Sequence, residues 1–153
     1  MKTLEHRIPP PIVTLLIGAV MWGLSRVSPS VNIDMRLRVA IAGAFFGFGG
    51  CVAAMGMLAF RRARTTINPV KVGDASSIVT SGIYQRTRNP MYVGLTSLLL
   101  GWTVFLAAPL ALLGPLVFVL FTARFQIVPE ERVLTLKFGR DFTDYQARVR
   151  RWL

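Results

Sequence analysis

Long stretches of apolar residues, separated by short polar segments, make up most of this chain. A helix that crosses a bilayer needs about 20 consecutive, predominantly apolar residues. Four stretches reach or approach that length: residues 9–27, 39–60, 91–107 and 110–125. The pattern therefore predicts an all-α integral membrane protein with about four transmembrane helices.

The connections between these stretches differ in length. Only Ala107, Ala108 and Pro109 separate the third stretch from the fourth, so we expect these two helices to form an antiparallel hairpin. Residues 65–88 instead contain glycines, serines and a proline without a clear helical period. Loops of this length are usually either functional or disordered, and the apolar residues at positions 78–84 favour an ordered one.

The C-terminal segment, residues 129–153, is predicted to form a separate amphipathic helix on the cytoplasmic side. Its apolar side chains recur every three or four residues and so fall on one stripe. These side chains are Leu134, Phe138, Phe142, Tyr145, Val149 and Trp152. Charged residues occupy the other faces, and Gly139 is a candidate for a bend. We expect the stripe to lie on lipid headgroups or to pack on the loop before the third stretch.

Basic residues outnumber acidic ones, with 18 Lys and Arg against 7 Asp and Glu and a net charge of +11. The aromatic residues lie inside the apolar stretches and not among the arginines, which favours membrane lipid over nucleic acid as the partner of this charge. The 61–88 loop and the tail carry most of the basic residues. The positive-inside rule then places that loop and both termini on the cytoplasmic side of the cytoplasmic membrane. Arg26, Arg36 and Arg38 fall on the opposite side.

Few side chains in the sequence are suited to bind a metal ion. Cys51 is the single cysteine and His6 the single histidine. An internal disulfide and a cysteine-rich metal site are therefore excluded, and a histidine-based metal site or triad is not expected. No secretory cleavage site stands out, so the first apolar stretch is expected to remain as a helix.

Polar residues gather at both outer ends of the predicted hairpin. The sequence SGIYQRTRNPMYVG, residues 81–94, precedes the hairpin, and FQIVPEERVL, residues 125–134, follows it. A short hairpin brings its two outer ends together, so side chains from the two segments should meet. We expect Arg88, Asn89 and Tyr92 to lie near Glu130 and Glu131.

Each of these residues also has an ordinary structural explanation. Asn89 suits the N-cap of a helix, Arg88 suits an anchor at the membrane surface, and an acidic pair complements a helix N-terminus. Taken together, these explanations are less convincing. Two adjacent carboxylates at the end of a membrane span are costly without a cation, which the nearby arginines or a cationic ligand would supply.

Short motifs follow one another around the predicted hairpin. They are Gly82-x-Tyr84, Arg88-Asn89-Pro90-x-Tyr92-x-Gly94, Glu130-Glu131-x-x-Leu134, Phe138-Gly139, Tyr145 and Arg150-Arg151-Trp152. Their order resembles the isoprenylcysteine carboxyl methyltransferase and phospholipid methyltransferase family. We therefore divide the chain into an N-terminal two-span region, residues 1–64, and a methyltransferase core, residues 65–153.

The resemblance implies S-adenosylmethionine as the cofactor, bound without a Rossmann sheet. The sequence has no glycine-rich dinucleotide fingerprint, which agrees with this. Matched by motif, the residues that would line the cofactor are Tyr84, Arg88, Asn89, Pro90, Tyr92, Gly94, Glu130 and Glu131. An arginine can bind the carboxylate of this cofactor, a glutamate its cationic or hydroxyl groups, and a tyrosine face its sulfonium methyl.

The resemblance also implies a lipophilic acceptor, and its expected catalytic residues are Glu131, Arg88, Arg124 and Gln126. Prenylcysteine enzymes have His where this chain has Asn89, and often Arg where it has Gln126, although Arg124 is close enough to hold a substrate carboxylate instead. We expect methyl transfer to a prenylcysteine-like carboxylate. The alternatives are an amine or thiol of a lipid or small molecule, for which Glu131 would take a proton from the amine, and a non-catalytic membrane protein.

Overall fold

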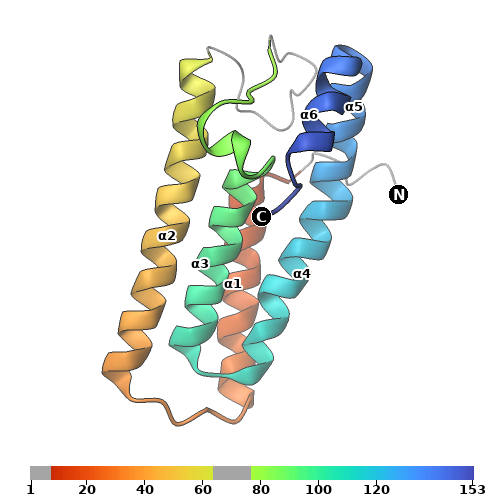
Figure 1. Cartoon of the computed structure of the whole chain (residues 1–153). Helices are drawn as coiled ribbons and strands as arrows, with labels where there is room; N and C mark the ends of the chain where they lie inside the picture. The colour runs from red at the N-terminus through yellow and green to blue at the C-terminus, as the bar shows by residue number, and fades with distance from the viewer. Residues whose placement is uncertain (1–7, 64–76) are drawn as a thin grey trace.

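The computed structural model describes residues 8–63 and 77–153 as a bundle of long helices (Figure 1). Helix α1 spans Pro10–Val27, α2 spans Met35–Arg62 and α3 spans Pro90–Leu106. A further continuous helix consists of η4 (Pro109–Leu112), α4 (Leu113–Thr122), η5 (Ala123–Ile127) and α5 (Val128–Phe138). The short helices η3 (Gly82–Gln85) and α6 (Arg140–Arg148) complete the described part of the chain.

Among the described residues, three helices are long and apolar enough to cross a membrane: Pro10–Val27, Met35–Arg62 and Pro109–Phe138. Helix α3 is also apolar but has only 17 residues. The described residues contain no β-strand. The predicted all-α membrane fold with about four spanning helices is thus confirmed.

The sequence explains where these helices begin. Helices α1, α3 and η4 each have a proline in the first turn, where the missing backbone N–H would have had no partner in the helix. Helix α2 follows Asp34, whose carboxylate accepts hydrogen bonds from the backbone N–H groups of Arg36 and Leu37 at 2.9 and 3.2 Å. Between α3 and η4, Ala107 adopts a left-handed φ of 48°, which reverses the chain within the short predicted turn.

Helices α2 and α3 pack closely because glycines face each other across their interface. A Cβ atom on Gly49 would lie 2.6 Å from the carbonyl oxygen of Gly94, and a Cβ atom on Gly94 would lie 2.6 Å from that of Gly49. Gly56 similarly leaves room for the ring of Pro90. These small residues therefore let the two backbones approach each other, as is common between membrane helices.

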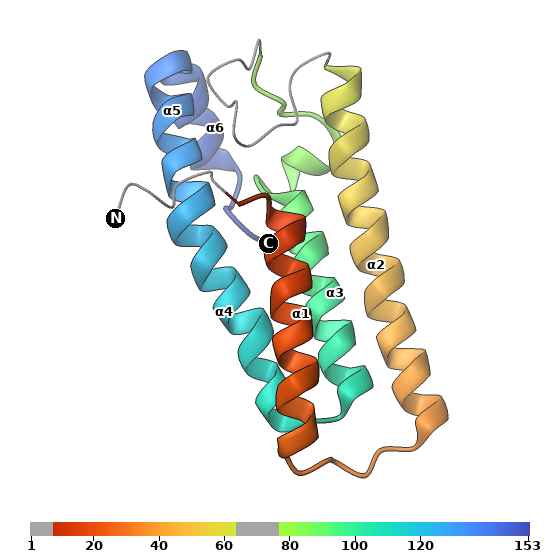
Figure 2. The same cartoon turned by 180° about the vertical axis from the view of Figure 1, so that it is seen from behind.

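Helix α1 packs against both α3 and α4 (Figure 2). The indole N–H of Trp102 donates a hydrogen bond of 3.0 Å to the carbonyl oxygen of Gly18. On the other side, Met21 fills the space beside Gly114, where a Cβ atom would overlap its sulfur. Helix α1 is consequently held by a polar contact to α3 and by close packing on α4.

The C-terminal amphipathic helix is shorter than the sequence indicated. Residues 128–138 continue the fourth spanning helix without a break, and the chain turns only at Gly139, which has a φ of 54°. Helix α6 follows, with Phe142 and Tyr145 buried. Pro129 does not end the preceding helix because it lies in the first turn of α5, after the wide turn η5.

Candidate active site

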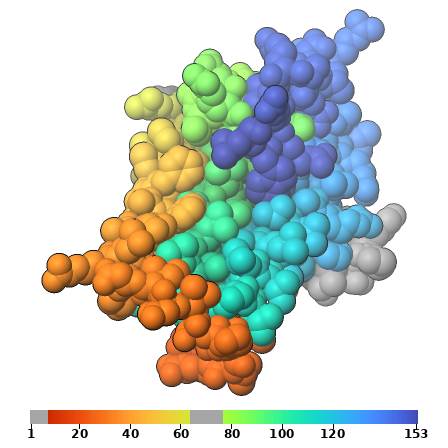
Figure 3. Space-filling view, turned by 60° about the horizontal axis from the view of Figure 1, so that its bottom comes forward, coloured from red at the N-terminus to blue at the C-terminus, as the bar shows by residue number. Residues whose placement is uncertain are grey.

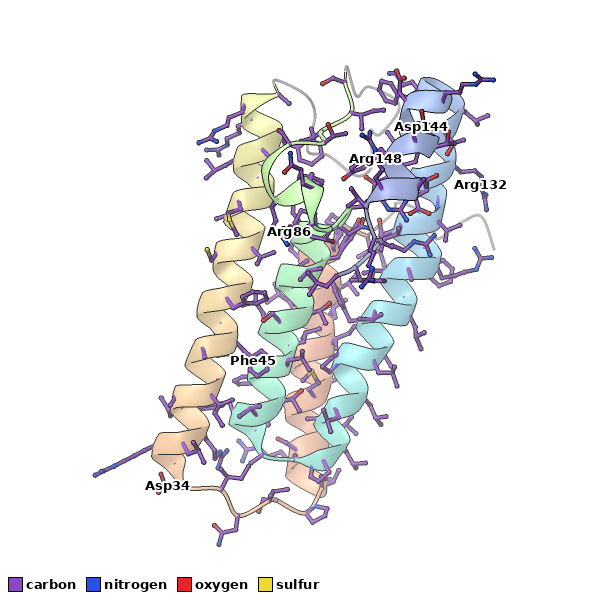
Figure 4. All side chains as sticks on the ribbon, in the orientation of Figure 1. Asp34, Phe45, Arg86, Arg132, Asp144 and Arg148 are labelled. Atoms are coloured by element: carbon purple, nitrogen blue, oxygen red, sulfur yellow. The ribbon has the colours of Figure 1, made fainter. Side chains whose placement is uncertain are left out.

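A cavity of about 300 Å³ lies at the end of the bundle where α3 begins. Segments distant in the sequence form its walls: the start of α1, the end of α2, residues 77–79, η3, the start of α3, η5, α5 and α6. Most lining side chains are apolar, including Met57, Phe60, Met91, Leu95, Ile127 and Leu134. The polar and aromatic lining residues include Tyr84, Arg88, Asn89, Tyr92, Glu130, Glu131 and Tyr145. Polar side chains crowd this end of the bundle in Figure 4, around the labelled Arg86 and Arg148.

Glu131 is held between two guanidinium groups. Arg151 donates to both of its carboxylate oxygens, from Nε at 3.1 Å and from Nη2 at 2.6 Å. Arg88 Nη1 lies 2.9 Å from Glu131 Oε1, and the Arg88 side chain is only 12% exposed. The pair of ion contacts neutralises Glu131 and fixes the direction in which Arg88 points.

Backbone carbonyl groups of the C-terminal residues accept hydrogen bonds from the segment before α3. The backbone N–H of Arg88 donates to the carbonyl oxygen of Arg150 at 3.0 Å, and Asn89 Nδ2 donates to that of Arg151 at 2.9 Å. In Figure 3 the last residues of the chain, in dark blue, lie against the green segment that precedes α3. Asn89 accordingly anchors the C-terminal segment, and its side chain makes no capping bond to α3.

Glu130 differs from its neighbour in having no ion pair or hydrogen bond to any described residue. It lines the same cavity and is partly buried. A carboxylate in such a place needs a cation or hydrogen-bond donors to offset its lost hydration. Glu130 is therefore the acidic group that a ligand can reach.

Tyrosine hydroxyls and rings complete the polar part of the cavity. Tyr145 donates a hydrogen bond of 2.7 Å to the carbonyl oxygen of Tyr84, which ties α6 to η3. Burial raises the pKa of Tyr145 to about 12, although nearby Arg88 lowers it. Burial, together with the charge of Glu130, also raises the pKa of Tyr84. Both phenols thus remain neutral at physiological pH and present uncharged rings to a ligand.

The cavity includes six of the residues that we expected from the sequence and leaves out four. Tyr84, Arg88, Asn89, Tyr92, Glu130 and Glu131 line it. Pro90 and Gly94 face α2 instead. Gln126 is 1% exposed, and its side-chain amide donates a hydrogen bond of 3.0 Å to the carbonyl oxygen of Ile8. Arg124 is exposed on the surface of the molecule.

Several residues of the site were not assigned to it from the sequence. Arg151 and Tyr145 belong to motifs that we quoted, but their contacts with Glu131 and Tyr84 depend on how the chain returns after Gly139. Met57 and Phe60 come from α2, and Pro10 and Pro11 from α1. Apolar lining residues of this kind carry no sequence signal that separates them from other residues of a membrane helix.

Comparison with known protein families identifies the family of this chain. A phospholipid methyltransferase family model matches residues 37–141. The chain belongs to the phospholipid methyltransferase family. The match includes most of α2 and the Glu130–Glu131 pair. Family membership and the apolar spanning helices together support a membrane methyltransferase.

Two curated proteins are similar to parts of this chain, and one of them is a methyltransferase. An uncharacterised protein of Haemophilus influenzae is 46% identical over 63 residues, which make up 41% of this chain and all of the relative. A Protein-S-isoprenylcysteine O-methyltransferase of Xenopus laevis is 37% identical over 79 residues, or 50% of this chain and 26% of that enzyme. No solved structure gives a significant match to this chain.

Proposed function

We propose that this membrane methyltransferase transfers a methyl group from S-adenosylmethionine to a lipophilic acceptor. One observation carries the proposal: a carboxylate that has no partner among the described residues and a largely buried guanidinium line the same, mainly apolar cavity. The two charged groups are Glu130 and Arg88. Opposite charges that line one mainly apolar cavity suit a ligand that carries both an ammonium and a carboxylate group.

The residues of the cavity fit this cofactor. Arg88 Nε is buried and has no hydrogen-bond partner among the described residues, so it can donate to a ligand carboxylate. Glu130 can accept from an ammonium group or from ribose hydroxyls. The rings of Tyr84 and Tyr92 can face a sulfonium, which aromatic rings attract.

When bound, S-adenosylmethionine supplies an electrophilic methyl group, with S-adenosylhomocysteine as the leaving group. The chain itself supplies alignment and a nonpolar environment, which are the main requirements of an in-line displacement. Arg88, held by Glu131, fixes one end of the ligand. Apolar walls such as Phe60 and Leu134 keep water away from the reacting atoms.

The proposed acceptor is an apolar molecule with a small polar head. The apolar walls of the cavity and its position at the end of membrane-spanning helices support such an acceptor. A prenylcysteine-like carboxylate is the first candidate, by analogy with the isoprenylcysteine methyltransferase of Xenopus laevis. A carboxylate acceptor needs no base, because it is already ionised.

An amine acceptor is the second candidate, and the position of two residues favours it. Arg124 and Gln126, which we expected to hold a substrate carboxylate, are not among the residues that line the cavity. Glu130 does line it and has no partner in the described chain, so it can take the proton that an amine loses. Glu131 is less suited to this role because Arg88 and Arg151 stabilise its ionised form.

Binding of S-adenosylhomocysteine to the purified, detergent-solubilised protein tests the cofactor. Calorimetry should detect binding to the unaltered protein, and Arg88→Ala should weaken it by about 1–3 kcal/mol through loss of a charge-assisted hydrogen bond. Arg86→Ala is the matched control, because Arg86 is exposed and does not line the cavity. Equal losses in both variants would remove Arg88 from the site, and no binding to the unaltered protein would overturn the proposal.

Methyl transfer to defined lipids tests the acceptor. S-adenosylmethionine with a labelled methyl group is supplied together with a farnesylcysteine analogue or with a lipid amine in mixed micelles. Label in the farnesylcysteine ester supports the first candidate, and label in the amine supports the second. Efficient methylation of a water-soluble acceptor, with none of either lipid, would contradict a lipophilic substrate.

A further inference from the structure

One turn of the fourth spanning helix is wider than an α-helical turn. The segment η5, Ala123–Ile127, is a π-helix, and the backbone N–H of Val128 bonds to the carbonyl oxygen of Ala123, five residues earlier. Such a turn accommodates one extra residue within an otherwise continuous helix. Everything that follows it, including Glu130 and Glu131, is rotated about the helix axis relative to α4.

The rotation decides which side chains point into the bundle. Phe118 and Thr122 are fully buried and define the inner face of α4. At about 100° per residue, an uninterrupted α-helix would place Glu130 about 120° from Phe118 around the axis. The extra residue in η5 reduces this angle to about 20°, in line with the inner face.

The extra residue also changes the directions in which the other cavity-lining residues of α5 point. Without the extra residue, Leu134 would lie about 160° from Phe118, on the outer side of the helix, and with it the angle is about 60°. Glu131 would lie about 140° from Phe118 on the other side of the helix, whereas the extra residue places it about 120° away on the same side as Leu134. There it contacts Arg88 at 2.9 Å. The wide turn therefore aligns Glu130 and Leu134 with the inner face and puts Glu131 on the same side of the helix, and all three line the cavity.

The sequence contains a reason for the turn at this position. Pro129 has no backbone N–H, and its ring would clash with the carbonyl group of Phe125 in a regular α-helix. A wider turn just before the proline moves these carbonyl groups away. Pro129 directly precedes the acidic pair, so one residue can favour the turn next to the side chains that the turn orients.

We propose that the π-turn at Ala123–Ile127 is a positioning element of the active site, which sets the rotation of the acidic pair relative to the membrane span. This inference rests on the proposed function for its readout. The length of the turn sets this rotation, and the chemistry of any one side chain within the turn does not.

Deletion of Ala123 tests the turn, because alanine contributes the smallest side chain in it. The deletion should convert the turn to an α-helical one and turn Glu130 and Glu131 away from the cavity. The affinity for S-adenosylhomocysteine, measured by calorimetry, should fall about tenfold or more as the charge-assisted contacts are lost. Ala123→Ser keeps the length of the helix and is the matched control, for which the affinity should be unchanged.

Two further variants distinguish rotation from general damage. Inserting an alanine between Phe125 and Gln126 in the deletion variant restores the register of the acidic pair and should restore the affinity. Inserting it between Leu134 and Thr135 restores the total length but not the register, and should not. In addition, Glu130→Gln should weaken binding in the unaltered protein but add almost nothing in the deletion variant.

The outcomes separate this inference from the proposed function. If the unaltered protein does not bind S-adenosylhomocysteine, the proposed function fails. If it binds and the deletion variant binds equally well, the proposed function stands and the role of the turn is disproved. Rescue by the second insertion as well as the first would also overturn it, because helix length and not rotation would then matter.

Discussion

Glu130 and Glu131 are neighbours in the sequence, but they have different surroundings. Glu131 contacts Arg88 and Arg151, whereas Glu130 has no charged partner among the described residues. Each carboxylate that leaves water needs compensation, and only Glu131 has it within the protein. This difference suggests separate roles: Glu131 maintains the geometry of Arg88, and Glu130 interacts with a ligand.

Amide substitutions of the two glutamates should separate these roles. Glu131→Gln should lower the free energy of unfolding of the detergent-solubilised protein by about 1–3 kcal/mol, because Arg88 and Arg151 lose their charged partner. Glu130→Gln should leave stability unchanged or slightly increased and should weaken the binding of S-adenosylhomocysteine. Thermal unfolding and calorimetry on both variants check this, and the same pattern for the two substitutions would contradict the division of roles.

Sequence reasoning identified the polar residues of the site but not all of their contacts. Arg88, Tyr92 and the acidic pair were predicted to meet because a short hairpin joins their elements, and they line one cavity. Gln126 was harder to place, since a π-turn alters which side of a helix a residue faces. No pattern of apolar residues reveals such a turn directly, because only one residue is added.

At the scale of elements, the glycines of α2 divide into two groups. Gly49 and Gly56 face α3, where added atoms would meet Gly94 or Pro90. Gly43, Gly47 and Gly50 have nothing within 4 Å of an added Cβ atom. The sequence alone does not separate these two groups, because glycines occur on several faces of this helix and only the packing distinguishes them.

Alanine substitutions on α2 should reveal this division. Gly49→Ala should destabilise the protein by about 1–3 kcal/mol, because its Cβ atom forces the backbones of α2 and α3 apart. Gly50→Ala, one residue further along, should have no such effect, since its Cβ atom meets no neighbour. Thermal unfolding in detergent measures both, and equal stability of the two variants would show that the close approach at Gly49 is not needed.

The candidate active site lies at one end of the molecule. Residues from α1, α2, η3, α3, α5 and α6 line the cavity there, and the opposite end contains the short turns at 28–34 and 107–109. The predicted boundary between residues 64 and 65 lies outside the described residues. Since α2 packs along α3 and contributes Met57 and Phe60 to the cavity, the first two helices support the site directly.

Two of the three arginines at the opposite end, Arg26 and Arg38, have local partners within the bundle. Arg38 donates a hydrogen bond to the carbonyl oxygen of Phe105, in the last turn of α3. Arg26 lies over the ring of Trp22, 4.7 Å from its centroid. Positive charge near the C-terminal end of a helix is favourable. Arg26 and Arg38 therefore stabilise the ends of α1 and α3, whichever side of the membrane they face.

Membrane orientation can be tested at exposed arginines from the two ends. Cysteines replacing Arg148 in α6 and Arg36 in α2, each in a Cys51→Ser background, report on opposite ends of the bundle. Because the loop before α3 and the C-terminal segment carry most of the basic residues, we expect the Arg148→Cys protein to react with an impermeant thiol reagent only in inside-out vesicles. The Arg36→Cys protein should react only in right-side-out vesicles. The reverse pattern would place the cavity and both termini outside the cytoplasm, where a cytoplasmic methyl donor could not reach Arg88 and Glu130.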